Sequence, residues 1–173
     1  MSIILDGTSG LTTNSGTLIS ASTIGVGGAT PSASGAGITF PATVSASSSG
    51  NTLDDYEEGL WTPTDGSGAS LSFTSVTGNY TKIGNKVTCW TRLTYPSTAS
   101  TAGAQLNGLP FTVSTTLSAS GGGMMAYKTT TALFSVRAIN ANAILMQNDT
   151  GAQPTNVALT LGTYIFAVTY FID

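Results

Sequence analysis

Two strand patterns joined by a Gly-Asn pair decide the fold of this 173-residue chain. The stretch reads Tyr80-Thr81-Lys82-Ile83-Gly84-Asn85-Lys86-Val87-Thr88-Cys89-Trp90-Thr91-Arg92-Leu93-Thr94-Tyr95. After Asn85 apolar and polar residues alternate with period two, which is the pattern of a half-buried strand. One face holds Val87, Cys89, Leu93 and Tyr95, and the other holds Lys86, Thr88, Trp90 and Arg92. A Gly-Asn pair between two such runs predicts a β-hairpin.

Similar short apolar runs follow throughout the second part of the chain. They predict further strands at residues 71–76, 124–128, 133–139, 143–147, 157–161 and 164–172. Turns are expected at Gly78-Asn79 and in the run Gly121-Gly122-Gly123. Residues 164–172 are apolar on both faces, so we expect a neighbouring subunit to cover the face that the core does not. The pattern predicts an all-β fold with an antiparallel, jelly-roll-like β-sandwich head over residues 65–173.

The first fifty residues have a different composition, dominated by Ser, Thr, Gly and Ala. They contain one of the fourteen aromatic residues, Phe40, and their aliphatic residues come in small, scattered groups. Ser, Thr and Gly are poor in helix interiors, and so few apolar groups cannot build a core of their own. We therefore expect residues 1–50 to form an extended attachment arm that becomes ordered against other chains. Residues 51–64 would form an acidic connector between this arm and the head.

Composition excludes several classes of function. Charged residues make up 8% of the chain, against about 25% in ordinary globular proteins. No Lys or Arg precedes Lys82, and five scattered basic residues provide no patch for nucleic acid. No apolar run approaches the roughly 20 residues that cross a bilayer, and the start of the chain lacks the features of a signal peptide. With no histidine, the chain cannot form a Ser-His-Asp or Cys-His nucleophile pair.

Few residues remain as candidates for chemistry. The single cysteine, Cys89, forms no intrachain disulfide and is expected as a buried core thiol in a chain made in a reducing cytoplasm. The only acidic cluster comprises Asp54, Asp55, Glu57 and Glu58. We interpret it as a solvated collar, with calcium binding and a catalytic carboxylate pair as the alternatives. Trp61 is expected to pack the connector onto the head. We predict no enzyme activity, no catalytic residue, no metal and no cofactor.

Five segments of the chain carry motifs of their own. They are Met1-Ser2-Ile3-Ile4-Leu5-Asp6-Gly7-Thr8, Gly37-Ile38-Thr39-Phe40-Pro41-Ala42-Thr43, Leu53-Asp54-Asp55-Tyr56-Glu57-Glu58-Gly59-Leu60-Trp61-Thr62-Pro63-Thr64, Gly78-Asn79-Tyr80-Thr81-Lys82-Ile83-Gly84-Asn85 and Leu106-Asn107-Gly108-Leu109-Pro110-Phe111. These segments resemble segments of bacteriophage tail-fibre-like proteins. Together they cover about a quarter of the chain. The resemblance implies a trimeric virion fibre with its N-terminal part docked on the particle and a β-rich head. It defines no functional residue.

The leading hypothesis is a structural phage virion protein, a homotrimeric short tail fibre or spike made in the host cytoplasm. Its partners would be its own copies, other virion proteins that contact residues 1–50, and a glycan or protein of the host surface. Ile3, Ile4 and Leu5 are the expected anchors on the particle. A capsid decoration or cement protein, or a head fibre, is the first alternative, and a polysaccharide-degrading enzyme is the second. Trp90 and Arg92 are assigned to a subunit interface, with contact to a sugar as the alternative.

Overall fold

The computed structural model describes residues 23–43, 46–116, 121–130, 134–139, 143–148 and 150–173. The chain divides into two compact units, Met1–Thr43 and Val44–Asp173. The predicted anchors Ile3, Ile4 and Leu5 lie outside the described residues.

The described part of the first unit contains one small parallel sheet. Strand β1 (Thr23–Gly25) pairs with β2 (Gly37–Thr39), and Ile24 lies opposite Ile38. Both isoleucines stay exposed, at 45% for Ile24 and 57% for Ile38. Both side chains are therefore largely open to solvent in the single chain.

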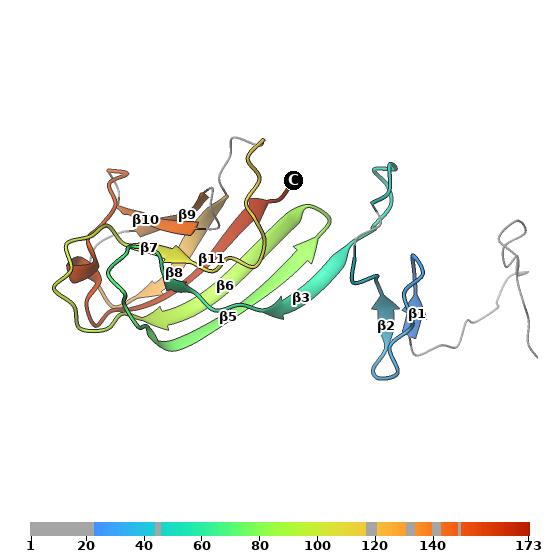
Figure 1. The fold of residues 1–173 in the computed structure, drawn as a ribbon, viewed down its shortest axis with the longest axis horizontal. Coiled ribbons are helices and arrows are strands. Elements are labelled where there is room, and N and C mark those ends of the chain that lie inside the picture. The colour runs from blue at the N-terminus through green and yellow to red at the C-terminus, as the bar shows by residue number, and fades with distance from the viewer. Residues whose placement is uncertain (1–22, 44–45, 117–120, 131–133, 140–142, 149) are drawn as a thin grey trace, which may run out of the picture. The chain divides into compact units, whose positions relative to one another are not determined.

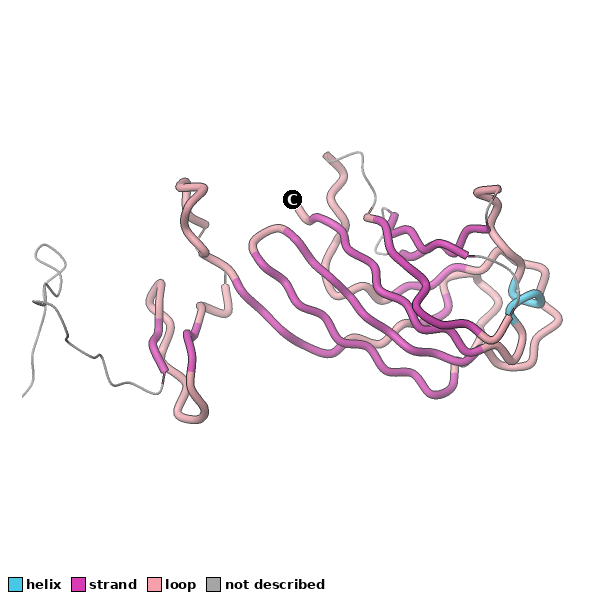
Figure 2. Tube along the Cα trace, turned by 180° about the vertical axis from the view of Figure 1, so that it is seen from behind, coloured by secondary structure: helices cyan, strands magenta, loops and turns pink. Residues whose placement is uncertain are grey.

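The second unit is built on a nine-stranded antiparallel sheet that curls on itself, in the order β3-β5-β6-β11-β8-β9-β10-β7-β4 (Figure 1). The strands are β3 (Tyr56–Leu60), β4 (Thr64–Asp65), β5 (Thr74–Ile83), β6 (Lys86–Thr94), β7 (Gln105–Asn107), β8 (Gly122–Lys128), β9 (Phe134–Ile139), β10 (Ala143–Asn148) and β11 (Thr163–Phe171). Figure 2 shows strands and loops through most of the chain, with one short helical turn among the described residues. The predicted all-β, antiparallel fold is confirmed, with one curled sheet in place of two separate ones.

The core lies on the inner face of this sheet. From β11 it receives Tyr164, Phe166, Val168 and Tyr170, all fully buried. From β6 it receives Val87, Cys89, Thr91 and Leu93, also fully buried. The predicted face of β6 is confirmed, as are the burial of Cys89 and the hairpin at Gly84-Asn85, where Ile83 pairs with Lys86.

The predicted turn at Gly78-Asn79 is wrong, because both residues lie inside β5. Position 78 must be glycine because Trp61 occupies the space that a side chain would fill. A Cβ atom there would lie 2.6 Å from the Trp61 carbonyl oxygen and 2.8 Å from the Trp61 Nε1 atom. The glycine marks the place where Trp61 crosses the strand.

The predicted turn at Gly121-Gly122-Gly123 is also wrong for its last two residues, which begin β8. Gly123 lies so close to β11 that a Cβ atom would approach the Ala167 carbonyl oxygen to 2.0 Å. As at Gly78, the missing side chain permits a close approach of the backbone.

The predicted strand at residues 157–161 is wrong as well. Asn156–Leu159 forms a 3₁₀-helix, labelled η1, and Leu159 is fully buried. The backbone N–H groups of Asn156 and Val157 donate to the carbonyl oxygens of Ala102 and Ser100, at 2.9 and 2.8 Å. These bonds to a neighbouring loop fix the turn and override the alternation of apolar residues.

Residues 51–64, interpreted from the sequence as a connector, contribute two strands to the sheet. Strand β3 pairs with β5 along its whole length, and β4 pairs with β7. These two strands stand at the opposite ends of the sheet order, and three residues join them in the chain. This stretch therefore links the two ends of the sheet.

Candidate functional site

Three of the segments that carry the resemblance meet in the structure. The acidic segment forms β3, and the segment around Tyr80 forms β5, in a register that sets Tyr56 opposite Ile83 and Leu60 opposite Asn79. The third segment begins in β7 and brings the Phe111 ring edge-on to Tyr80, with ring centroids 5.3 Å apart. These segments therefore pack against one another, so their first role is to build the fold.

A buried ion pair lies where the motifs meet. Asp55 and Lys82, each 6% exposed, form a salt bridge between the chain before β3 and strand β5. The Lys82 ammonium also lies 5.3 Å from the centre of the Phe111 ring. Burial lowers the pKa of Lys82, while the nearby Asp54 carboxylate acts in the opposite direction. The interpretation of the cluster as a solvated collar is wrong for Asp55, because Asp55 is buried in this ion pair, while Glu57 and Glu58 stay exposed.

The other acidic side chains of the described residues also accept hydrogen bonds within the chain. Glu57 accepts from the Tyr80 hydroxyl, and this bond raises the pKa of Tyr80 to about 12. Glu58 accepts from the Tyr56 hydroxyl. The Ser47 N–H donates to Asp54 at 2.6 Å. The acidic residues around β3 are thus held by local donors.

Asp65 and Asp173 organise two loops in the same way. Asp65 accepts from the backbone N–H groups of Ser67 and Leu71, at 3.0 and 3.1 Å. Asp173 accepts from hydroxyls of residues 114–116, and these bonds lower the pKa of Asp173 to about 2. In the part of the chain that the structure describes, no three His, Cys, Asp or Glu side chains are placed to hold a metal ion.

Trp61 packs onto the head, as predicted. It is 6% exposed, and its indole Nε1–H donates to the Trp90 carbonyl oxygen at 3.1 Å. Its backbone N–H donates to the Gly78 carbonyl oxygen at 3.0 Å. Trp61 thereby ties the end of β3 to both β5 and β6.

The outer face of the sheet carries several exposed apolar side chains. One row crosses five neighbouring strands in register, and its members are Leu60, Asn79, Trp90, Ala167 and Met124. Leu60 is 82% exposed and Met124 79%. The parallel row next to it contains Thr77, Arg92, Ile165 and Tyr127. Both sequence-predicted residues of the head, Trp90 and Arg92, therefore lie side by side at the centre of this face.

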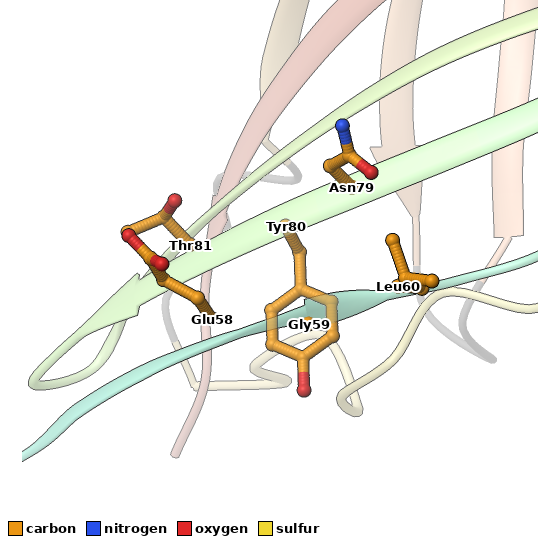
Figure 3. Close-up of a pocket in the computed structure, with 6 residues that line it drawn as sticks. All are labelled: Glu58, Gly59, Leu60, Asn79, Tyr80 and Thr81. Atoms are coloured by element: carbon orange, nitrogen blue, oxygen red, sulfur yellow. The ribbon is translucent and has the colours of Figure 1, made fainter. Parts of the chain in front are cut away.

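A shallow hollow of about 440 Å³ opens at the β3 end of the row (Figure 3). Two cross-strand pairs wall it, Glu58 with Thr81 and Leu60 with Asn79. Between them Gly59 has no side chain, and the Tyr80 ring passes over it. Sequence patterns did not identify this hollow, because it depends on the pairing of β3 with β5. Gly59 inside a strand was the one local signal.

Comparisons with known proteins add a coarse likeness. No family model matches the chain, and no curated protein matches it. Among solved structures, the chain is similar to the crystal structure of the Dettilon tailspike protein (gp208), with a TM-score of 0.49 and 18% identity. The match covers 68% of this chain and 24% of the tailspike, so the chain spans about a quarter of that protein's length. Within the described residues, no helix has the length and apolar character to cross a membrane.

Proposed function

We propose that the chain is a structural virion protein of a bacteriophage, a short homotrimeric tail fibre or spike. Residues 1–50 attach it to the particle, with Ile3, Ile4 and Leu5 as anchors, and the β-rich head faces outward to bind the host surface. The protein works through binding surfaces and carries out no chemical step.

One observation supports this proposal best: the head's described carboxylates are all engaged by donors of the same chain, while several large apolar side chains lie exposed on one sheet face. Every carboxylate of the described residues accepts a hydrogen bond from a neighbouring donor in the chain. In contrast, Leu60, Trp90 and Met124 stand on an open sheet face. Carboxylates tied into the scaffold are suited to hold a fold, and an exposed apolar face is suited to bind another molecule.

Exposed apolar side chains in the first unit likewise support the attachment role. Its exposed Ile24 and Ile38 lie opposite each other on paired strands. Side chains of this type lose contact with water when a strand of another protein adds to the sheet or a surface closes over it.

Gold-labelled antibody against the chain, imaged on intact phage particles, tests the proposal. We expect a few labels confined to the tail. Labels spread over the capsid would instead indicate a decoration protein, and unlabelled particles would contradict a virion role altogether. Release of sugar fragments from host polysaccharide by the purified chain, abolished by Glu57→Gln, would contradict the non-enzymatic role.

A further inference from the structure

We infer that the outer face of β5, β6, β11 and β8 binds a second copy of this chain, with Leu60, Trp90 and Met124 in the contact. The inference rests on the proposed fibre function, which requires the chain to associate with itself, and it names the face through which the copies meet.

The row on this face runs in register from strand to strand and is apolar except for Asn79. Trp90 stands between Asn79 on β5 and Ala167 on β11, and Met124 stands next to Ala167 on β8. The core does not use these side chains, because the opposite face of β11 already buries four residues completely. A strand that is apolar on both faces is typical of a sheet covered on both sides.

The extent of the face suits a contact between whole protein domains. Four neighbouring strands about 4.8 Å apart, with seven to ten residues each, span roughly 19 by 30 Å at about 3.4 Å per residue. The resulting area of roughly 600 Å² approaches the 800 Å² or so that each partner contributes to a stable interface.

The charges on this side of the sheet favour a copy of the same chain. Arg92 is the one ionised side chain in the two rows that contain Trp90 and Ile165. Trp and Arg are both enriched at the centres of protein interfaces. Glu58 lies at the far end of the same face, beside the hollow. In the described residues neither Arg92 nor Glu58 forms an ion pair within its own chain. A cyclic assembly brings different parts of one face together, so the two opposite charges of neighbouring copies can pair.

A sugar accounts less well for the same surface. Ligand sites for small molecules place a few converging polar groups around an apolar floor. Here Asn79 and Arg92 lie beside Trp90, but Leu60 and Met124, the two most exposed members of the row, stand at its ends and offer no hydrogen bond. A row of this length is matched by an equally broad apolar surface, and this face of another copy is such a surface.

Sedimentation velocity of the full chain over a range of concentrations tests the inference. We expect an oligomer for the natural chain and dissociation for Trp90→Ser combined with Met124→Ser, with the midpoint concentration raised at least about tenfold. Val157→Ser is the matched control. Val157 is 40% exposed, close to the 39% of Trp90, but it lies on η1, away from the sheet face. This control should associate like the natural chain.

Met124→Glu provides a second variant that leaves the fold of each subunit intact, because Met124 is 79% exposed in the single chain. It should dissociate the oligomer while the circular dichroism spectrum stays unchanged. If the natural chain is monomeric at every concentration, both the face and the trimeric fibre are wrong. If the natural chain is oligomeric and Met124→Glu associates equally well, the face is wrong and the fibre proposal stands. A shift of tryptophan fluorescence when host oligosaccharides are added to the assembled protein, absent in Trp90→Phe, would overturn the inference in favour of a sugar site.

Discussion

The close approach of Trp61 to Gly78 makes Gly78→Ala a strong test of how β3 is held. The new methyl group would lie 2.6 Å from the Trp61 carbonyl oxygen and 2.9 Å from its Cδ1 atom. Trp61 would have to move, although it donates hydrogen bonds to the Gly78 and Trp90 carbonyl oxygens. Overpacking costs about 1–3 kcal/mol, and the loss of one of these hydrogen bonds adds about 1 kcal/mol. We expect the free energy of unfolding to fall by about 2–4 kcal/mol.

Urea unfolding of the full chain at one fixed protein concentration measures this effect, since association would otherwise shift the midpoint. With a slope of about 2 kcal/mol per molar urea, the midpoint should fall by about 1–2 M. Gly122→Ala is the matched control, because Gly122 also lies in a strand but a Cβ atom there meets nothing within 4 Å. That change should leave stability unaltered or raise it by up to about 1 kcal/mol. If both variants unfold at the same urea concentration, the proposed role of Gly78 is refuted.

Three further predictions concern ionisable groups. Lys82→Met leaves the Asp55 carboxylate buried without its partner and should lower the free energy of unfolding by about 3–5 kcal/mol in the same urea assay. The double variant Lys82→Met/Asp55→Leu should regain most of this lost stability. Because burial raises the pKa of the Cys89 thiol to about 12, iodoacetamide should alkylate it only after unfolding; rapid alkylation of the folded protein, followed by mass spectrometry, would contradict its burial. The pKa of Asp173, lowered to about 2, lies below the ordinary value of about 3.9, so the stability it contributes should be present at neutral pH and lost as the pH falls from about 4 to 2. Asp173→Asn should remove this part of the acid dependence, and acid unfolding followed by circular dichroism would show whether it does.

The sequence predicted those features that depend on neighbouring residues. Alternation over β6 identified its buried face, because side chains in a strand point to opposite sides in turn. The pair Gly84-Asn85 identified the hairpin, since glycine adopts the positive φ of 56° that the turn requires. Gly78 was misread because a glycine in a strand has the same local signature whether it turns the chain or makes room for a distant side chain. Only the pairing of β3 with β5 shows that Trp61 is that side chain.

The ion pair was missed for a related reason. The sequence showed an acidic cluster and a strand containing Lys82, but charge alone does not reveal which acid meets which base. The register of β3 against β5 brings Lys82 to Asp55 at the end of the strand pair. A better signal was present in β5. Lys82 comes two residues after Tyr80, so the alternation of the strand places both side chains on its inward face. A lysine at such a position needs a buried acid as partner.

The outer face shows that one sheet can carry two kinds of surface. On β9 the outward residues are Ser135 and Arg137, both exposed and polar, as on most solvated sheets. On β6, β11 and β8 the outward positions include Trp90, Ile165 and Met124 beside polar residues such as Thr88 and Arg92. Since both regions belong to the same sheet and the same weakly charged chain, general composition cannot explain the difference between them. The apolar side chains are therefore a local property of these three strands, which is what a specific contact surface requires and a uniformly apolar protein would lack.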